Sequence, residues 1–383
     1  MVDQEKSIVR KPIRVLLIAP EHPTGTQFHR MIVPNCALDP KEFEVLVAHD
    51  LSQVMKRDFE GIDVVILSRL ITSFMIKGDT KNMVEKACLS YLKEYKNKLI
   101  VDIDDIPQIP ETFRLYETQK KDKTAESIIT SLKRADVIWT TTEPLKKKIQ
   151  KLIATTAKKQ SQKPVLIVPN GISKHDGQWT TKKLKHPDLR IGVACMDNHW
   201  PDIKLLKPVL KKLENVKGWR IMAMGCDVEY KAEVKKLLGT DRITFVPWVS
   251  PYEYATQYRK IDLLLCPLSH NAYNSCRSDI KFAEAAHSNT PVIAENFGPY
   301  KGHKCAIDDW SKLEQIVKDY VTGKPKVLDQ FRITDTENYN TDKADEIRIN
   351  SIKELVHGKP KRPITKKKVP ANTIRRKKAA KPS

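Results

Sequence analysis

Short apolar runs recur along the chain, and each is followed by a polar loop and then by a stretch with helical spacing. Residues 14–20, 62–69 and 98–105 are such runs in the first half, and residues 261–267 and 291–294 are two more in the second. Their continuous apolar character is typical of strands that are covered on both faces. Strands that alternate with helices predict parallel sheets with helices on both sides, which is an α/β fold.

The length and one polar stretch predict two domains. A chain of 383 residues exceeds the usual size of one domain, and two units of about 150 to 200 residues would each bury a core. The best boundary lies within residues 170–187, a polar segment that contains Gly171 and Gly177. A last helical segment is predicted over residues 341–356.

A helix in the second half carries the first candidate site. Arg277, Lys281 and Glu284 follow one another at spacings of four and three, so a helix would present all three on one face. Asn274 or Ser275 could cap this helix, and the free N–H groups of its first turn would suit a pyrophosphate. Arg277 and Lys281 would add positive charge, and Glu284 could accept hydrogen bonds from the hydroxyls of a ribose.

A plainer interpretation of this pattern is a solvated helix face with an internal pair of opposite charges. The neighbouring loop favours the binding site instead. Residues 268–275 are polar and follow an apolar strand, and open parallel sheets bind ligands at the carboxyl ends of their strands.

The stretch 261–300 resembles the nucleotide-sugar half of glycosyltransferases with two facing Rossmann-like domains, the GT-B fold. The similarity is to the broad retaining group called family 4, whose donor site follows the pattern DI-x-L-x-PL, N-x-CKSDLK-x-x-E and G-x-PV. This chain has IDLLLCPL, NSCRSDIKFAE and SNTPVIAENFGPY in the same order. Weaker matches extend the resemblance over residues 14–320, among them KPVLIVPNGIS, which is similar to the exit from the family's first domain.

The resemblance implies a domain layout. Residues 1–175 would form an acceptor-side Rossmann-like domain, and residues 186–330 would form the domain that binds the nucleotide sugar. Residues 331–358 would pack back across the interface as a helix, as the last helix does in the family. Residues 359–383 would follow as a flexible basic tail.

The resemblance also implies further donor-site residues. Asn274 and Ser278 lie in the matching block, and Gly25 stands where the family's first loop lets the backbone approach the diphosphate or the sugar. Arg30 matches a basic residue of the family, and His199 matches a loop at the mouth of the second domain. The alternatives are a simple turn at Gly25, a surface position for Arg30 and a helix cap at His199.

Three aspartates, Asp102, Asp104 and Asp105, end one of the apolar runs. The metal-binding DxD of the other glycosyltransferase fold and the nucleophile motif of haloacid-dehalogenase-like phosphatases both hold Mg²⁺ or Mn²⁺ through carboxylates. The phosphatase motif lies on the first strand and continues into Gly-Thr, whereas this one continues into IPQIP. The GT-B family has a similar motif at the cleft mouth and handles the diphosphate without metal. The resemblance therefore implies that Asp104 and Asp105 orient the acceptor hydroxyl or act as its base, with a turn and helix cap as the alternative.

Cys276 departs from the family pattern. Many retaining members carry a glutamate eight residues before the one represented by Glu284, and that acid contacts the donor sugar. Cysteine in this slot leaves the sugar open, while the overall resemblance implies retention at the anomeric carbon. Charge stabilisation of the leaving diphosphate by Arg277 and Lys281 would serve a front-side displacement.

Cysteine usage and the amino terminus favour a cytoplasmic protein. The seven cysteines include no CxxC pair, and Cys195, Cys226 and Cys266 lie in apolar runs, as buried thiols do. A metal cluster is therefore not expected. The first twelve residues hold no long apolar run, so neither a signal peptide nor a membrane anchor is expected.

The net charge points to a polyanionic partner. The formal charge is +21, and residues 359–383 contain eleven Lys or Arg and no acid, which leaves +10 for the other 358 residues. Such an arm cannot build a core and would bind nucleic acid or an anionic membrane through its charge. Improved solubility is the plainer alternative, and a membrane-inserting helix is disfavoured because the arm has few large apolar residues.

These features lead to three functional hypotheses. The favoured one is a glycosyltransferase that moves a sugar from a nucleotide sugar to hydroxymethylated pyrimidines in DNA, of the kind that some bacteriophages make. A UDP-sugar is the expected donor, and no tightly bound cofactor is expected. The second hypothesis is the same enzyme class acting on an envelope polysaccharide or a lipid-linked acceptor. The third is an inactive GT-B scaffold that binds nucleic acid.

Overall fold

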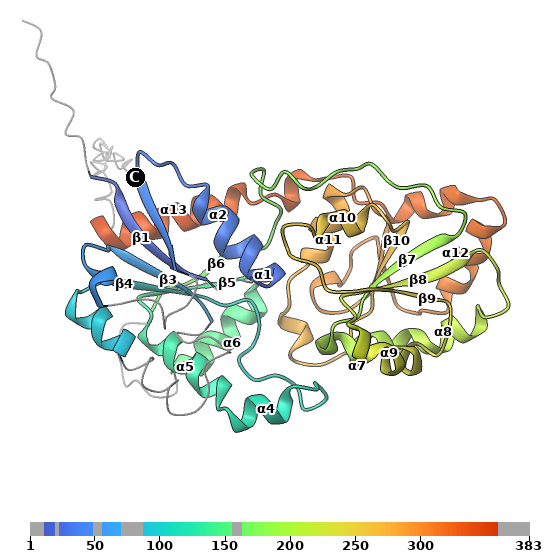
Figure 1. The fold of residues 1–383 in the computed structure, drawn as a ribbon, viewed down its shortest axis with the longest axis horizontal. Helices are drawn as coiled ribbons and strands as arrows, with labels where there is room; N and C mark the ends of the chain where they lie inside the picture. Colours follow the sequence, from blue (N-terminus) through green and yellow to red (C-terminus); the bar gives the residue numbers. More distant parts are fainter. Residues whose placement is uncertain (1–10, 20–22, 49–55, 70–86, 155–162, 359–383) are drawn as a thin grey trace, which may run out of the picture.

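The computed structural model describes residues 11–19, 23–48, 56–69, 87–154 and 163–358, which form two α/β domains side by side (Figure 1). Each domain contains one parallel six-stranded sheet with helices on both faces, which confirms the predicted fold class. The predicted basic tail, residues 359–383, lies outside the described residues. Within the described part of the chain, no helix combines the length and the apolar character that a bilayer crossing requires.

The first domain is built on a sheet with the strand order β2-β1-β3-β4-β5-β6. Its strands are β1 (Ile13–Ile18), β2 (Phe43–Ala48), β3 (Val64–Ser68), β4 (Lys98–Asp102), β5 (Val137–Thr140) and β6 (Val165–Ile167). The central strands are buried on both faces, so the apolar runs predicted them to within a few residues. The chain passes from β1 to β2 on one side and to β3 on the other, which places a switch point between β1 and β3.

Two groups of helices cover this first sheet. Helices α5 (Thr124–Arg134) and α6 (Glu143–Ala154) pack on one face through buried leucine and isoleucine side chains. The other face is covered by α1 (Gly25–Gln27), the π-helical turn η1 (Phe28–Ile32), α2 (Val33–Cys36) and α13 (Asp342–His357). A short helix, α4 (Tyr116–Lys121), lies at the lower edge of the domain in Figure 1.

The second domain repeats this design with the strand order β12-β11-β10-β7-β8-β9. Its strands are β7 (Leu189–Ala194), β8 (Trp219–Met224), β9 (Ile243–Val246), β10 (Leu263–Cys266), β11 (Val292–Glu295) and β12 (Ala306–Ile307). Its helices are α7 (Trp200–Ile203), α8 (Lys207–Lys212), α9 (Lys231–Leu238), α10 (Ala255–Tyr258), α11 (Ile280–His287) and α12 (Lys312–Val321). The switch point of this sheet lies between β7 and β10.

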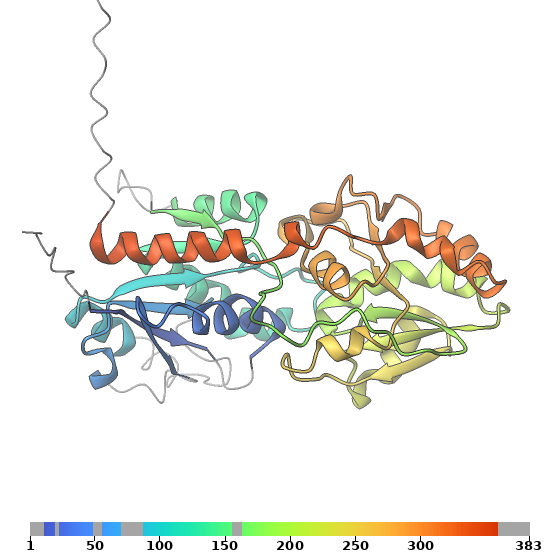
Figure 2. The same cartoon turned by 90° about the horizontal axis from the view of Figure 1, so that it is seen from above.

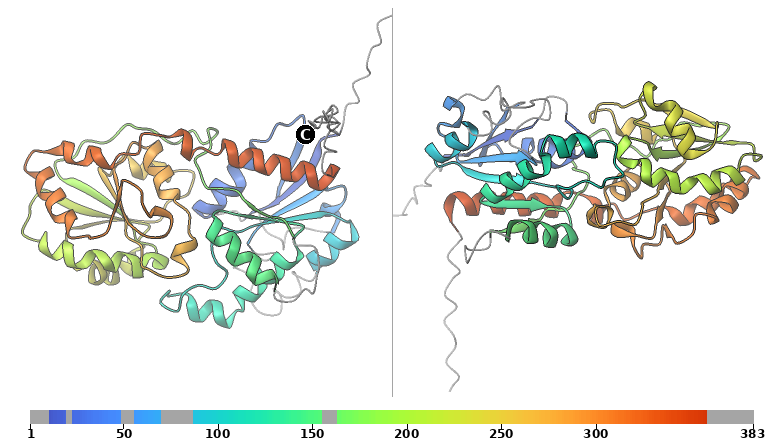
Figure 3. Two further views of the ribbon diagram at one scale, coloured as in Figure 1. Left: turned by 180° about the vertical axis from the view of Figure 1, so that it is seen from behind. Right: turned by 90° about the horizontal axis from the view of Figure 1, so that it is seen from below.

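The chain crosses between the domains twice. The first crossing follows β6, and the second leads into α13, which lies along the first domain in Figures 2 and 3. Helix α13 adds Ile352 to the core beneath β1 and β3, and its Ser351 Oγ accepts a hydrogen bond from Trp139 Nε1 at 3.1 Å. The first domain is therefore completed by the last described helix.

The two crossing segments are bonded to each other. An isolated β-bridge pairs Ile172 with Asn340, and the Ile172 amide donates to the Tyr339 carbonyl at 2.9 Å. A Cβ atom at Gly171 would lie only 2.6 Å from the Asn340 carbonyl oxygen. Glycine is required here because the two backbones approach too closely for any side chain.

Candidate functional site

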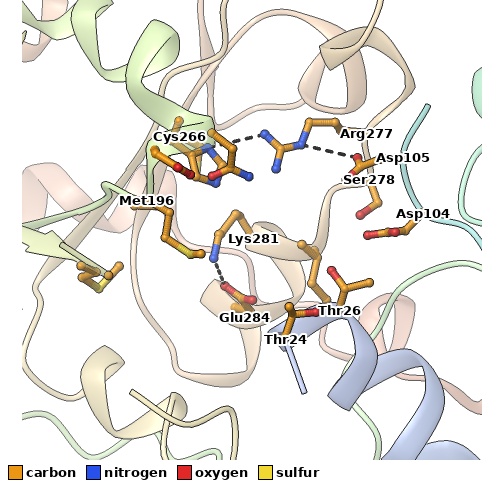
Figure 4. A pocket seen from close by; sticks show the side chains of 18 of the residues that line it. Thr24, Thr26, Asp104, Asp105, Met196, Cys266, Arg277, Ser278, Lys281 and Glu284 are labelled. Atoms are coloured by element: carbon orange, nitrogen blue, oxygen red, sulfur yellow. Dashed lines mark hydrogen bonds and ion pairs between the residues drawn. The ribbon is translucent and has the colours of Figure 1, made fainter. Parts of the chain in front are cut away.

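A pocket of about 470 Å³ lies between the two domains, where the switch points of both sheets face each other (Figure 4). Open parallel sheets bind their ligands at this place. Nine of the ten residues that the sequence predicted for the site line the pocket: Gly25, Arg30, Asp104, Asp105, His199, Arg277, Ser278, Lys281 and Glu284. The tenth, Asn274, does not line it and is fully buried.

The helix that was predicted to include Arg277 begins after it, so this part of the prediction is wrong. Residues Asn274–Cys276 form a separate 3-10 turn, Arg277 is extended with φ −64° and ψ 165°, and α11 begins only at Ile280. Asn274 does not cap the helix, because its side chain donates to Asp202 Oδ1 and to the Ser269 carbonyl, both at 2.9 Å. Arg277 therefore reaches the pocket from an extended segment, and only Lys281 and Glu284 share a face of α11.

Lys281 and Glu284 form a buried pair that faces the pocket. Lys281 Nζ donates to Glu284 Oε2 at 2.8 Å and to the Tyr254 hydroxyl at 2.7 Å. Burial alone would lower the pKa of Lys281, but the attraction of Glu284 and Tyr254 raises it above the ordinary value, so the amine stays charged. The Tyr258 hydroxyl also donates to Oε2 of Glu284. The hydrogen bonds described for this carboxylate thus both use Oε2, which leaves Oε1 for a ligand.

Arg277 stands between groups of both domains. Its Nη1 lies 3.5 Å from His199 Nδ1 and 3.9 Å from Asp202 Oδ2, and its Nε lies 3.9 Å from Asp105 Oδ1 of the first domain. Burial and the neighbouring charge of Arg277 lower the pKa of His199, so this imidazole is neutral near pH 7. None of these contacts is a short ion pair, so Arg277 keeps N–H groups for a ligand in the pocket.

Asp104 and Asp105 are held by Arg69, a residue that the sequence did not single out. Arg69 Nε donates to Asp104 Oδ1 at 2.7 Å, and Nη2 donates to Asp105 Oδ2 at 3.0 Å. Burial would raise the pKa of Asp104, but the charges of Arg69 and Arg30 lower it below the ordinary value. Asp104 is therefore ionised near pH 7, which makes it a good hydrogen-bond acceptor and a weak base.

Arg30 is buried, and its contacts are structural. Its Nε donates to Asp102 Oδ2 at 2.8 Å, and its Nη1 donates to the Val168 carbonyl at 2.8 Å and to Asn170 Oδ1 at 2.6 Å. Asn170 Nδ2 in turn donates to Ser278 Oγ at 2.6 Å. Arg30 touches the pocket wall, but its described N–H groups are directed at the protein, so it secures the segment after β6, which Asn170 links to Ser278 ahead of α11. The sequence predicted a ligand contact for Arg30, with a surface position as the alternative. The buried, protein-bonded Arg30 fits neither placement.

Gly25 lines the pocket, whereas Cys276 does not. A Cβ atom at Gly25 would meet no heavy atom within 4 Å, so the backbone of α1 borders open space. Cys276 is buried among apolar side chains of the first domain, and its carbonyl accepts from Thr142 Oγ1 at 2.8 Å. Burial raises the pKa of the Cys276 thiol, which excludes a reactive thiolate at neutral pH.

A metal ion has no ready ligand set in the described residues, since no three His, Cys, Asp or Glu side chains there converge on one point. The two carboxylates nearest to such an arrangement, Asp104 and Asp105, are bound to Arg69. The cations of the pocket are guanidinium and ammonium groups, which suit phosphate oxygens.

Comparison with known proteins supports the fold. No family model matches the chain, and no curated protein matches it in sequence. Sucrose-phosphate synthase from Thermosynechococcus elongatus superposes with a TM-score of 0.58 at 11% identity, over 90% of this chain and 99% of that one. HepE from Anabaena, solved with UDP-glucose, superposes with a TM-score of 0.57 at 11% identity, over 89% of this chain and 100% of that one.

An enzyme of another activity shares the same architecture. A putative UDP-N-acetylglucosamine 2-epimerase from Listeria monocytogenes superposes with a TM-score of 0.51 at 14% identity, over 90% of this chain and 96% of that one. Identities this low show a common fold alone. The two Rossmann-like domains with a pocket between them thus form a GT-B fold, which these neighbours share although their activities differ.

Proposed function

We propose that this protein is a glycosyltransferase that uses a nucleotide sugar, with a UDP-sugar as donor. The observation that carries this proposal is the set of Arg277, Lys281 and Glu284 at the switch point of the second sheet. Two cations and one carboxylate in an interdomain pocket fit a ribose diphosphate. Structural neighbours solved with UDP or UDP-glucose support the same donor class.

Each part of the donor would contact a different group of residues in the pocket. Arg277 and Lys281 would bind the diphosphate, and Oε1 of Glu284 would accept from a ribose hydroxyl. The nucleobase would lie at the apolar end of the pocket, which Met196, Val246 and Trp248 line. The sugar would then point toward Asp104 on the first domain, because Gly25 has no side chain and leaves open space in the pocket.

The transfer would break the bond between the anomeric carbon and the diphosphate oxygen and form a bond from that carbon to the acceptor oxygen. Arg277 and Lys281 would stabilise the negative charge that develops on the departing diphosphate. Asp104 would orient the acceptor hydroxyl, and its lowered pKa makes it a poor proton acceptor. A front-side displacement passes the acceptor proton to the departing phosphate oxygen, so a weak base supports retention of configuration.

The acceptor that we propose is DNA with hydroxymethylated pyrimidines, modified in the cytoplasm of a cell that carries a phage. The formal charge of +21 supports a polyanionic acceptor, and the hydroxymethyl group supplies a nucleophilic oxygen. An envelope polysaccharide or a lipid-linked acceptor is the alternative, because a basic surface also binds anionic lipid.

The test is nucleoside mass spectrometry on hydroxymethylpyrimidine DNA incubated with the full-length chain and a panel of nucleotide sugars. Glu284→Gln should abolish the reaction, and Glu214→Gln, an exposed acid of the same domain, should not. A hexose or pentose mass gain that depends on Glu284 would establish donor site and acceptor together. Conversion of the free nucleotide sugar without transfer would favour an epimerase, and an unchanged profile with every donor would exclude the DNA acceptor.

A further inference from the structure

The backbone of Arg69 has a conformation that side-chain-bearing residues rarely adopt. Among the described residues, four that are not glycine have a positive φ: Arg69 (59°), Lys96 (58°), Lys123 (51°) and Asn289 (49°). Arg69 alone of these four lines the pocket. Its amide donates to the Asp102 carbonyl at 2.9 Å, which ties the turn after β3 to the end of β4. Strained backbone of this kind persists where surrounding contacts impose it, and it gathers at functional sites.

The guanidinium of Arg69 is oriented by its two acidic neighbours and is only partly used by them. Nε and Nη2 bind Asp104 and Asp105, and no hydrogen bond from Nη1 to another described residue is present. The side chain is 29% exposed, which is more than Arg277 or Lys281 on the opposite wall. The two carboxylates fix the plane of the guanidinium, and Nη1 carries the N–H groups that none of these hydrogen bonds uses.

The pocket therefore has cations on both walls. Arg277 and Lys281 belong to the second domain, Arg69 belongs to the first, and Asp105 lies 3.0 Å from Arg69 and 3.9 Å from Arg277. Figure 4 shows Asp104 and Asp105 across the pocket from Lys281 and Glu284. Arg277 and Lys281 of the second domain would bind the diphosphate of the donor. Arg69 of the first domain would then have no phosphate of the donor to bind.

We infer that Arg69 binds a phosphate of the acceptor strand next to the acceptor nucleotide, and so selects a polynucleotide over a neutral acceptor. This inference rests on the proposed function and adds the group by which the acceptor is recognised. Guanidinium N–H groups bind phosphate oxygens, and Nη1 is the group of Arg69 that would donate, because Nε and Nη2 are bound to Asp104 and Asp105. The same two carboxylates aim the guanidinium and accept the acceptor hydroxyl, which couples the position of the phosphate to that of the nucleophile.

The test measures binding of a short single-stranded oligonucleotide with 5-hydroxymethylcytosine to the full-length chain by fluorescence anisotropy, with UDP present. Arg69→Gly, whose backbone suits the left-handed turn, should weaken binding about tenfold and reduce the salt dependence by about 0.7 in the log–log slope. Arg69→Lys keeps the charge and loses the fork, so it should weaken binding severalfold. Calorimetry with UDP should show binding to all three proteins, because Arg277, Lys281 and Glu284 are unchanged in them.

Lys96→Gly is the matched control. Lys96 is exposed, precedes β4 at the edge away from the pocket, and has almost the same φ, so the variant removes the same charge and the same backbone strain. It should change oligonucleotide affinity less than twofold.

Oligonucleotide binding that is unchanged in both Arg69 variants would overturn the inference, and so would equal losses in Arg69→Gly and Lys96→Gly. If Arg69→Gly does not fold, Arg69→Lys decides. A chain that binds UDP but no oligonucleotide would overturn the inference and leave the donor half of the proposed function standing. A chain that binds the oligonucleotide through Arg69 but no UDP would support the inference and overturn the proposed function.

Discussion

Asp105 and Arg277 lie 3.9 Å apart, and they come from opposite domains. Asp105 is also bound to Arg69, so one carboxylate separates the cation of the first domain from the cation of the second. This contact links the two domains at the pocket, together with the hydrogen bond from Asn170 to Ser278.

Asp105→Asn should increase the affinity for UDP while lowering the rate of transfer. The variant removes a negative charge that competes with the diphosphate for Arg277, an effect of about 0.5 to 1 kcal/mol for a partly exposed pair. Transfer should fall because Arg69 loses one of its two anchors. Calorimetry with UDP checks the first effect, with Asp188→Asn as a control on the surface of the second domain. A decrease in UDP affinity would show that Asp105 supports the donor site.

Lys281→Met should lower the affinity for UDP at least tenfold. The change removes a charged donor of the pocket, and a hydrogen bond to a charged group contributes about 1.5 to 3 kcal/mol. Lys236→Met, an exposed lysine on α9, should bind UDP as the unmodified chain does. Equal affinities for both variants would remove Lys281 from the donor site.

Acidification below pH 6.5 should destabilise the fold through His199. Burial and the charge of Arg277 lower its pKa from the ordinary value of 6.5. The unfolded chain therefore binds a proton at a higher pH than the folded chain, so stability is lost as the pH falls through 6.5. Urea unfolding at pH 7.5 and pH 5.5 should show a smaller pH effect in His199→Gln than in His357→Gln, which changes an exposed histidine. Equal pH effects in the two variants would mean that folding does not lower the pKa of His199.

Ile352→Ala should destabilise the first domain by about 3 kcal/mol. Ile352 is fully buried against strands of the first sheet, and removing buried methyl groups costs about 2 to 5 kcal/mol. Asn350→Ala, two residues earlier and exposed, should stay within about 0.5 kcal/mol of the unmodified chain. Urea unfolding measures the change in the free energy of unfolding of both variants. A small effect of Ile352→Ala would mean that α13 contributes little to the stability of the first domain.

The strands could be predicted because each central strand is covered on both faces. The apolar runs at residues 62–69 and 98–105 correspond to β3 and β4, and both strands are nearly completely buried. Their ends were predicted less well: β3 ends at Ser68 before the left-handed Arg69, and β4 ends at Asp102, three residues before the end of its apolar run. The layout of the site followed from the same pattern, since ligands bind at the carboxyl ends of such strands.

The start of α11 and the role of Arg69 could not be predicted from local spacing. Helix α11 begins late because Asn274 is bonded to Asp202, a residue 72 positions earlier in the chain. Arg69 pairs with Asp104 across two neighbouring strands, 35 positions apart. Only the register of β3 with β4, in which Ser68 pairs with Asp102, brings these two loops to the same level.

The bonded crossing at Ile172 and Asn340 follows from the path of the chain. The second domain is an insertion within the first, and the two connecting peptides are joined side by side. Two connections that are bonded to each other restrict the relative rotation of the two domains more than a single connection would.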